Sequence, residues 1–261
     1  MSPDPHTGKV VSADGTVIAF DRRGDGPPLV LVLGAFNDRS THQAFAEELA
    51  AYFTVFNYDR RGRGGSGDAP EYSVEAEIAD LAAIVRQTSS APVVFGYSSG
   101  AVLALAAAAA GVPVRGLALY EPPPVRTDQP FAEQLDRLIT AGERGAAVEY
   151  FQTDIIGIPE SIVSQMRNAP FRPALEAMAH TLVYEMTILG GVVHPADSAA
   201  AVSVPTVVMV GEQSPPMLHD SAAAIASANS TFRLHVLAGQ NHDIAPSVVS
   251  LMLKDQFLQR H

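Results

Sequence analysis

The sequence contains no cysteine, which excludes a disulfide scaffold and any metal site built on thiolates. Basic residues are also scarce, because 17 lysines and arginines stand against 28 acidic residues and leave a formal net charge of −11. Nucleic acids and anionic membranes select basic surfaces, so neither is expected as a partner. Lysine occurs only at Lys9 and Lys254. This lysine-poor, arginine-rich composition is typical of a GC-rich bacterial genome.

Long hydrophobic segments are missing as well. The longest apolar run, residues 101–112, is too short to cross a bilayer, and residues 1–8 lack the apolar core of a signal peptide. A chain of 261 residues that is 47% hydrophobic can bury a substantial core, as one domain or as one domain with an insertion. These features predict a soluble, acidic, cytoplasmic protein.

One short motif carries the strongest chemical signal. An apolar, strand-favouring run enters a Gly-x-Ser-x-Gly turn centred on Ser98, and an alanine-rich segment typical of a helix leaves it. Small residues are needed two positions to each side of such a serine, because the strand and helix backbones approach closely there. The turn would lift the Ser98 hydroxyl out of the sheet, beside the free N–H groups and positive dipole end of the helix. Ser98 is therefore the candidate nucleophile.

The order of the expected elements defines the fold class. A hairpin signal comes first, and strands then alternate with helices in two blocks of the chain. The expected strands are residues 9–12, 16–21, 29–33, 53–58, the run from residue 93 that enters the Ser98 turn, 116–120, 206–210 and 231–236, and the clearest helices are 42–52, 72–87, the segment after residue 100, and 247–259. Such alternation predicts an α/β protein with a largely parallel sheet and right-handed crossovers.

The alternation lapses between the two blocks. Residues 122–197 contain helical segments at 131–141, 146–152, 161–168 and 173–189 but no convincing strand. Helices inserted after a strand would lie over the carboxyl edge of the sheet, where open α/β sheets bind ligands. The sequence thus predicts a core of residues 1–121 and 198–261 with a helical lid of residues 122–197.

Four motifs, in this order along the chain, resemble those of the α/β-hydrolase family. They are Leu-Gly-Ala-Phe at 33–36, Asp-Arg-Arg-Gly-Arg-Gly-Gly-Ser at 59–66, the turn around Ser98, and Gly-Gln-Asn-His at 239–242. The resemblance covers nearly the whole chain. It implies a mostly parallel eight-stranded sheet with helices on both faces, and a hydrolase that uses a serine, an acid and a histidine without a cofactor or a metal.

A serine needs a base to accept its proton, and His242 is the best candidate among eight histidines. It follows the last expected strand and would therefore reach the same sheet edge as Ser98. The plainer alternative is a surface loop histidine. His180, on an expected lid helix, could line the pocket, although a packed or exposed helix histidine is the more ordinary interpretation.

The acid departs from the commonest family pattern. The family usually carries it after the strand at 206–210, and the matching position here is Ser214, which cannot stabilise an imidazolium. An alternative family site lies after the preceding strand, where this chain has Glu121. A carboxylate that ends an apolar strand is costly unless it is paired. With the Ser98–Ser99 pair, this arrangement resembles the branch of the zearalenone-type lactone hydrolases. Glu121 is the predicted acid, and Glu212 is its rival.

The family match also suggests the oxyanion hole. It would consist of the backbone N–H groups of Ser99 and Ala35, with Phe36 as the fallback for the second donor. Residues 59–66 are expected to form a structural turn. Its arginines, Arg60, Arg61 and Arg63, are expected to lie at the surface or in ion pairs.

The resulting hypothesis is a serine hydrolase that cleaves a small hydrophobic ester or lactone, with a homodimer possible. Alternatives on the same residues are a C–C hydrolase, a lyase or a cofactor-free haloperoxidase. The fold also serves non-catalytic proteins that bind small molecules.

Overall fold

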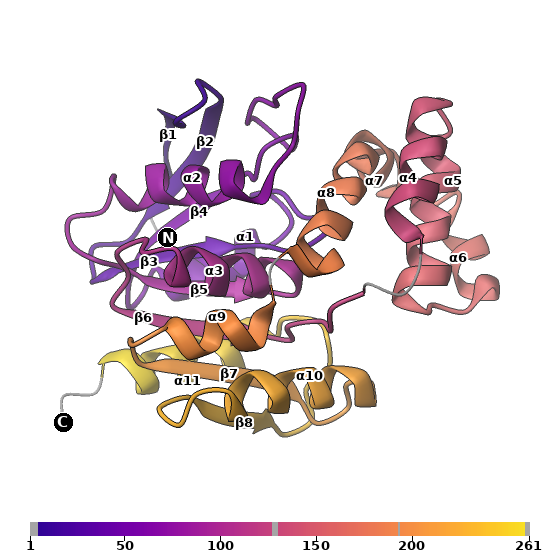
Figure 1. Ribbon diagram of the computed structural model, residues 1–261. Coiled ribbons are helices and arrows are strands. Elements are labelled where there is room, and N and C mark those ends of the chain that lie inside the picture. Colours follow the sequence, from indigo (N-terminus) through magenta and orange to yellow (C-terminus); the bar gives the residue numbers. More distant parts are fainter. Residues whose placement is uncertain (1–4, 127–129, 193, 259–261) are drawn as a thin grey trace.

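The computed structural model describes residues 5–126, 130–192 and 194–258 (Figure 1). Its strands form one sheet in the order β1-β2-β4-β3-β5-β6-β7-β8. Their bounds are β1 His6–Val11, β2 Val17–Arg23, β3 Pro28–Val32, β4 Thr54–Tyr58, β5 Val93–Tyr97, β6 Gly116–Tyr120, β7 Thr206–Gly211 and β8 Arg233–Leu237. β2 pairs antiparallel with β1 and β4, and every other pair is parallel. The predicted mostly parallel eight-stranded sheet is confirmed.

Helices cover both faces of this sheet. Successive residues of its central strands point to opposite faces, and the residues on both faces are apolar. On β3, Leu29 and Leu31 belong to one buried cluster, whereas Val30 and Val32 belong to the other. The first cluster contains residues of α1 (Gln43–Leu49) and α11 (Pro246–Leu258). The second contains residues of α2 (Val74–Val85), α3 (Ser99–Ala109) and α10 (Pro216–Ser227). The last residue of the expected final helix, 259, lies outside the described residues.

Two helices have no counterpart in the sequence analysis. They are α9 (Pro195–Ala201) and α10, and each starts with a proline at its first turn. Proline in the first turn followed by alanines is a helix-start signal that the sequence does contain. Helix α9 runs across the boundary expected between residues 197 and 198 and packs against α3. No helix in the described ranges is long and apolar enough to cross a membrane.

The segment between β6 and β7 is helical throughout its described elements. It contains α4 (Phe131–Thr140), α5 (Arg144–Tyr150), a π-helix (Phe151–Ile156), α6 (Glu160–Met166), α7 (Arg172–Ala177), a 3₁₀-helix (Ala179–Thr181), α8 (Leu182–Thr187) and a second π-helix (Ile188–Val192). The expected single helix at 173–189 is therefore broken into several pieces. Figure 1 shows α4 to α7 standing to one side of the sheet, with α8 between them and the strands. Their role as a lid stays a prediction.

Candidate active site

Ser98 lies on the turn between β5 and α3 with a backbone φ of 55°, a value that non-glycine residues rarely adopt. The turn is tight because the neighbouring backbones almost touch. A Cβ added at Gly96 would lie 2.5 Å from the Cα of Ala101, and one added at Gly100 would lie 2.2 Å from the carbonyl oxygen of Val32. Only glycine fits these positions, as the Gly-x-Ser-x-Gly pattern indicates. Strained backbone of this kind persists where the surrounding structure enforces it, often at functional sites.

Glu121 and His242 come together although they lie far apart in the sequence. Oε2 of Glu121 is 3.2 Å from Nδ1 of His242. The glutamate side chain is 0% exposed, whereas the imidazole is 40% exposed and lines the same cavity as Ser98. Among the hydrogen bonds of the described residues, none joins Ser98 to His242 in this conformation. Catalytic hydrogen bonds often tighten only when substrate is present.

The second oxygen of Glu121 is held by the turn after β7. Oε1 accepts hydrogen bonds from the backbone N–H of Gly211 and, at 2.8 Å, from the hydroxyl of Ser214. Ser214, at the position where the family usually has its acid, is thus a partner of the buried carboxylate. The rival Glu212 is exposed and accepts a hydrogen bond from the N–H of Gly239 at 2.8 Å. The carboxylate beside His242 therefore belongs to Glu121.

Tyr120 fixes the loop that carries His242, a contact that the sequence analysis did not include. Its phenol donates a 2.6 Å hydrogen bond to the carbonyl oxygen of Asn241. Burial raises the pKa of this phenol, with the nearby Glu121 carboxylate as a smaller cause, so the donor stays protonated. A tyrosine that ends a buried strand usually finds a partner for its hydroxyl, which is the signal that could have identified it.

The candidate oxyanion donors, Ala35 and Ser99, line the same cavity as Ser98. Ser99 is the first residue of α3, so its N–H has no acceptor within the helix. Ala35 lies in the loop after β3, and its N–H is not a donor in any hydrogen bond found among the described residues. The carbonyl of Ala35 is engaged instead, by the Nδ2 of Asn37 at 2.7 Å. Two amides without an acceptor among the described residues therefore border the nucleophile.

A buried ion-pair cluster lies beneath the loop that carries Ala35. Arg60 donates to the carbonyl oxygen of Leu33 at 3.2 Å, and Arg63 donates to that of Gly34 at 2.6 Å. Both guanidiniums also bind Oε1 of Glu185 from α8. Burial alone would raise the pKa of Glu185, but the two guanidiniums outweigh it and hold the pKa below its usual value. The cluster joins the helical segment to the loop beside the nucleophile.

The arginines of residues 59–66 are ion-paired, as one of the two sequence-based interpretations holds, but none lies at the surface. Arg60, Arg61 and Arg63 are at most 2% exposed. Arg61 binds Asp80 through two nitrogens at 2.7 and 2.8 Å. The expectation of surface arginines is wrong because acidic partners far along the chain make their burial possible.

The cavity at Ser98 has a volume of about 310 Å³. Its lining is mostly apolar and includes Phe36, Phe151, Ile155, Ile156, Leu189, Met217 and Leu218. The π-helical and α8 regions of the inserted segment contribute part of this lining. His180 does not line it; its Nε2 lies 3.4 Å from Asp68. A small pocket with few polar groups near a candidate nucleophile is typical of a small-molecule site.

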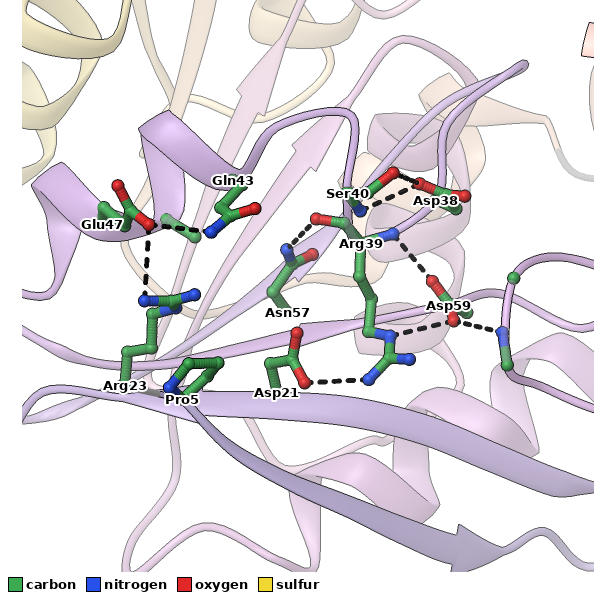
Figure 2. A pocket seen from close by; sticks show the side chains of 13 residues that line it. Pro5, Asp21, Arg23, Asp38, Arg39, Ser40, Gln43, Glu47, Asn57 and Asp59 are labelled. Carbon is green, nitrogen blue, oxygen red and sulfur yellow. Dashed lines mark hydrogen bonds and ion pairs between the residues drawn. The ribbon is translucent and has the colours of Figure 1, made fainter. Parts of the chain in front are cut away.

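A second cavity of about 540 Å³ lies elsewhere and contains none of the predicted site residues (Figure 2). Both arginines of its lining are ion-paired, and the four carboxylates beside them leave an excess of negative charge. Arg39 lies 2.9 Å from both Asp21 and Asp59, and Arg23 lies 3.4 Å from Glu47. Arg39 and Asp59 thereby attach the loop after β3 to the end of β4. Across the described ranges, no group of three or more histidine or acidic side chains is arranged to hold a metal ion.

Comparison with known proteins assigns the family. Residues 29–250 match the model of the alpha/beta hydrolase family, a family of hydrolase enzymes, and the chain belongs to it. An alpha/beta hydrolase from Sphaerobacter thermophilus is 45% identical, with 96% of this chain and 100% of that chain aligned and a TM-score of 0.89. An esterase from Thermogutta terrifontis is 25% identical, with 96% and 97% aligned and a TM-score of 0.70.

Curated relatives match over shorter stretches. N-formylmaleamate deformylase of Pseudomonas putida is 36% identical over 118 residues, which is 43% of this chain and 44% of that protein. This chain aligns with less than half the length of the first curated relatives that it matches, 35% and 44%. These similarities support hydrolase chemistry, and the substrate has to be argued from the site.

Proposed function

We propose that the protein is a serine hydrolase that cleaves a carboxylic ester or lactone through an acyl-enzyme. The observation that carries this proposal is the arrangement around one cavity. Ser98 on its strained turn, the His242 imidazole backed by Glu121, and the two unengaged amides of Ala35 and Ser99 all border the same space. These are the parts that acyl transfer to a serine requires.

The proposed reaction has two halves. The Ser98 oxygen attacks the carbonyl carbon while Nε2 of His242 takes the hydroxyl proton, and Nδ1–H donates to Glu121 throughout. The amides of Ala35 and Ser99 hold the oxyanion. When the tetrahedral intermediate collapses, the C–O bond of the ester breaks and the leaving alkoxide receives the proton from His242. Water then attacks the acyl-enzyme with His242 as base, and the carboxylic acid and free Ser98 are released.

The leaving group is the open part of this proposal. The names of similar proteins cover an esterase, an enol-lactonase from Burkholderia xenovorans and a deformylase that acts on N-formylmaleamate. All three names fit acyl transfer with different leaving groups. Esters and lactones are proposed here because an alkoxide leaves more readily than an amine.

A turnover panel of p-nitrophenyl esters of increasing chain length and simple lactones tests the proposal. Activity on at least one substrate should disappear in Ser98→Ala and in His242→Ala. Because the two residues act as a unit, the double variant should be hardly slower than either single variant. Turnover that survives in Ser98→Ala would contradict the serine mechanism, and a protein that binds the panel without turning it over would be a binding protein of this fold.

A further inference from the structure

Arg126 places a cation at the wall of the cavity that contains Ser98. It follows β6 by six positions and lines this cavity together with Ser98 and His242. Its backbone N–H donates a 2.7 Å hydrogen bond to the carbonyl oxygen of Leu189, so the segment is fixed at this point. Its guanidinium carbon lies 6.0 Å from the centre of the Phe131 ring. The arginine is half-buried and its base is anchored.

The guanidinium of Arg126 has N–H donors that no described residue accepts from. Among the described residues its hydrogen bonds run from Nη2 alone, to the carbonyl oxygen of Ile155 at 3.1 Å and weakly to the sulfur of Met217 at 3.9 Å. No carboxylate of the described residues lies within 4.0 Å of it, whereas buried Arg60, Arg61 and Arg63 all have such partners. A guanidinium carries five N–H donors, so several remain for a ligand.

The acidic groups at the cavity already have partners. Glu185 is bound by both Arg60 and Arg63, and the buried carboxylate of Glu121 accepts hydrogen bonds from Gly211 and Ser214. Within the described lining, Arg126 is therefore the cation without a matching anion, in a wall that is otherwise mostly apolar. A charge-assisted hydrogen bond is stronger in such surroundings than in water.

We propose that Arg126 binds a carboxylate of the substrate, so that the enzyme prefers small esters or lactones that carry a free carboxylate group. The planar guanidinium matches the geometry of a carboxylate better than any other side chain does. Both Arg126 and Ser98 border one cavity of about 310 Å³, at the small end of ligand sites. A single short substrate can therefore reach both. The inference rests on the proposed hydrolase function and specifies its substrate class.

The overall charge of the protein does not supply this recognition. A net charge of −11 repels anions at long range, although salt screens that repulsion beyond about 8 Å at physiological ionic strength. Selection for an anionic substrate must then come from a local cation inside the cavity. Arg126 is placed to provide it.

Two esters with the same carbon chain test the proposal. Monomethyl succinate carries a carboxylate, and dimethyl succinate replaces it with a neutral ester. The measured quantity is the ratio of kcat/KM for the charged over the neutral ester. We expect Arg126→Met to lower this ratio roughly 10- to 100-fold, because one charge-assisted interaction is lost. Arg126→Lys, which keeps the charge, should retain part of the preference.

A matched control removes an arginine of the same helical segment outside the cavity. Arg137 is exposed on α4 and donates to Gln134 at 2.7 Å. Arg137→Met should leave the ratio as in the parent protein. An equal loss for both esters in Arg126→Met would show that Arg126 only supports the fold through Ile155, and it would overturn the proposal. A ratio that Arg126→Met does not change would overturn it too.

Binding measurements separate this inference from the proposed reaction. In the Ser98→Ala background, calorimetric titration should show monomethyl succinate binding about tenfold or more tightly than dimethyl succinate, with the difference lost when Arg126→Met is added. If neither ester is hydrolysed by the parent protein but this binding difference is found, the proposed reaction fails for these esters and the carboxylate site stands. If the binding difference is absent, the carboxylate site is refuted, whatever the turnover.

Discussion

Replacing Glu121 with glutamine is the most revealing perturbation of the site, because the structure dictates how the new amide must orient. Oε1 of Glu121 accepts a hydrogen bond from the backbone N–H of Gly211, which can only donate. In the variant Glu121→Gln, the amide oxygen must take that place. The NH₂ group then occupies the position of Oε2, which lies 3.2 Å from Nδ1 of His242.

This orientation forces the wrong tautomer on the imidazole. The amide N–H donates to Nδ1 of His242, so Nδ1 must be unprotonated and the proton moves to Nε2, the nitrogen that has to accept the Ser98 proton. The imidazolium also loses its negative partner. The equivalent change in a serine protease costs about 10⁴ in kcat. We expect Glu121→Gln to lower kcat by roughly 10³- to 10⁴-fold, with little change in KM.

Glu212→Gln is the matched control. It removes a carboxylate directly after β7, with the same change in charge and size. Glu212 is exposed and only accepts a hydrogen bond from Gly239. The kcat of Glu212→Gln should stay within about twofold of that of the parent protein, since substitutions of exposed residues seldom change the fold. Steady-state kinetics on the best substrate of the panel, with circular dichroism to check folding, measures both variants.

The opposite pattern would refute the reasoning. If Glu212→Gln lost activity and Glu121→Gln kept it, the acid would belong to the turn after β7. If both variants were fully active, His242 would need no acidic partner, and the proposed mechanism would lose the reason for burying Glu121 beside it.

Three further predictions concern the support of the site. Glu185→Gln should lower the free energy of unfolding by about 3 kcal/mol at pH 7, because buried Arg63 loses the carboxylate that pairs with it among the described residues, whereas Arg60 keeps Glu77; since the folded-state pKa of Glu185 is depressed, the loss should shrink as pH falls below 4.5, and a pH-independent loss in urea titrations would argue against it. Gly100→Ala should lower the free energy of unfolding by about 3 kcal/mol, because the new Cβ would lie 2.2 Å from the carbonyl oxygen of Val32; a melting temperature like that of the parent protein would contradict the tight turn. Tyr120→Phe should lower kcat about fivefold through the lost bond to Asn241, and an unchanged kcat would show that other contacts hold the loop.

Much of the sheet is predictable from the sequence because its strands are short, buried and apolar. The strand expected at 116–120 is β6 residue for residue, and the strand expected before the Ser98 turn is β5. The site residues are predictable for a related reason. Ser98 and Glu121 each follow a parallel strand directly, and the carboxyl ends of parallel strands meet at one edge of a sheet.

Contacts between remote residues could not be predicted. Arg60 and Glu185 are separated by 125 positions, and no local pattern relates them. Arginine is mostly exposed in proteins, so residue type alone favoured the surface for residues that are in fact buried. Helices α9 and α10 have no counterpart in the sequence analysis, although the prolines in their first turns mark where they start.

The orientation of the inserted helices is likewise a tertiary property. The sequence predicts helical segments at 146–152 and 173–189, but only packing decides which side chains reach the cavity. Phe151 and Ile155 do, whereas Phe171 is half exposed. Arg126 lies in a segment without a sequence motif that indicates ligand binding. Only its place beside the cavity makes it a candidate for substrate binding.

The central claim, that Ser98 is an activated nucleophile, is tested most directly by covalent labelling. The protein is incubated with a fluorophosphonate, and intact mass and peptide mapping locate the adduct. We predict one adduct per chain, on Ser98, and much slower labelling in His242→Ala, because a serine without its base is a poor nucleophile. An unlabelled protein, or an adduct on another residue while Ser98 stays free, would contradict this claim.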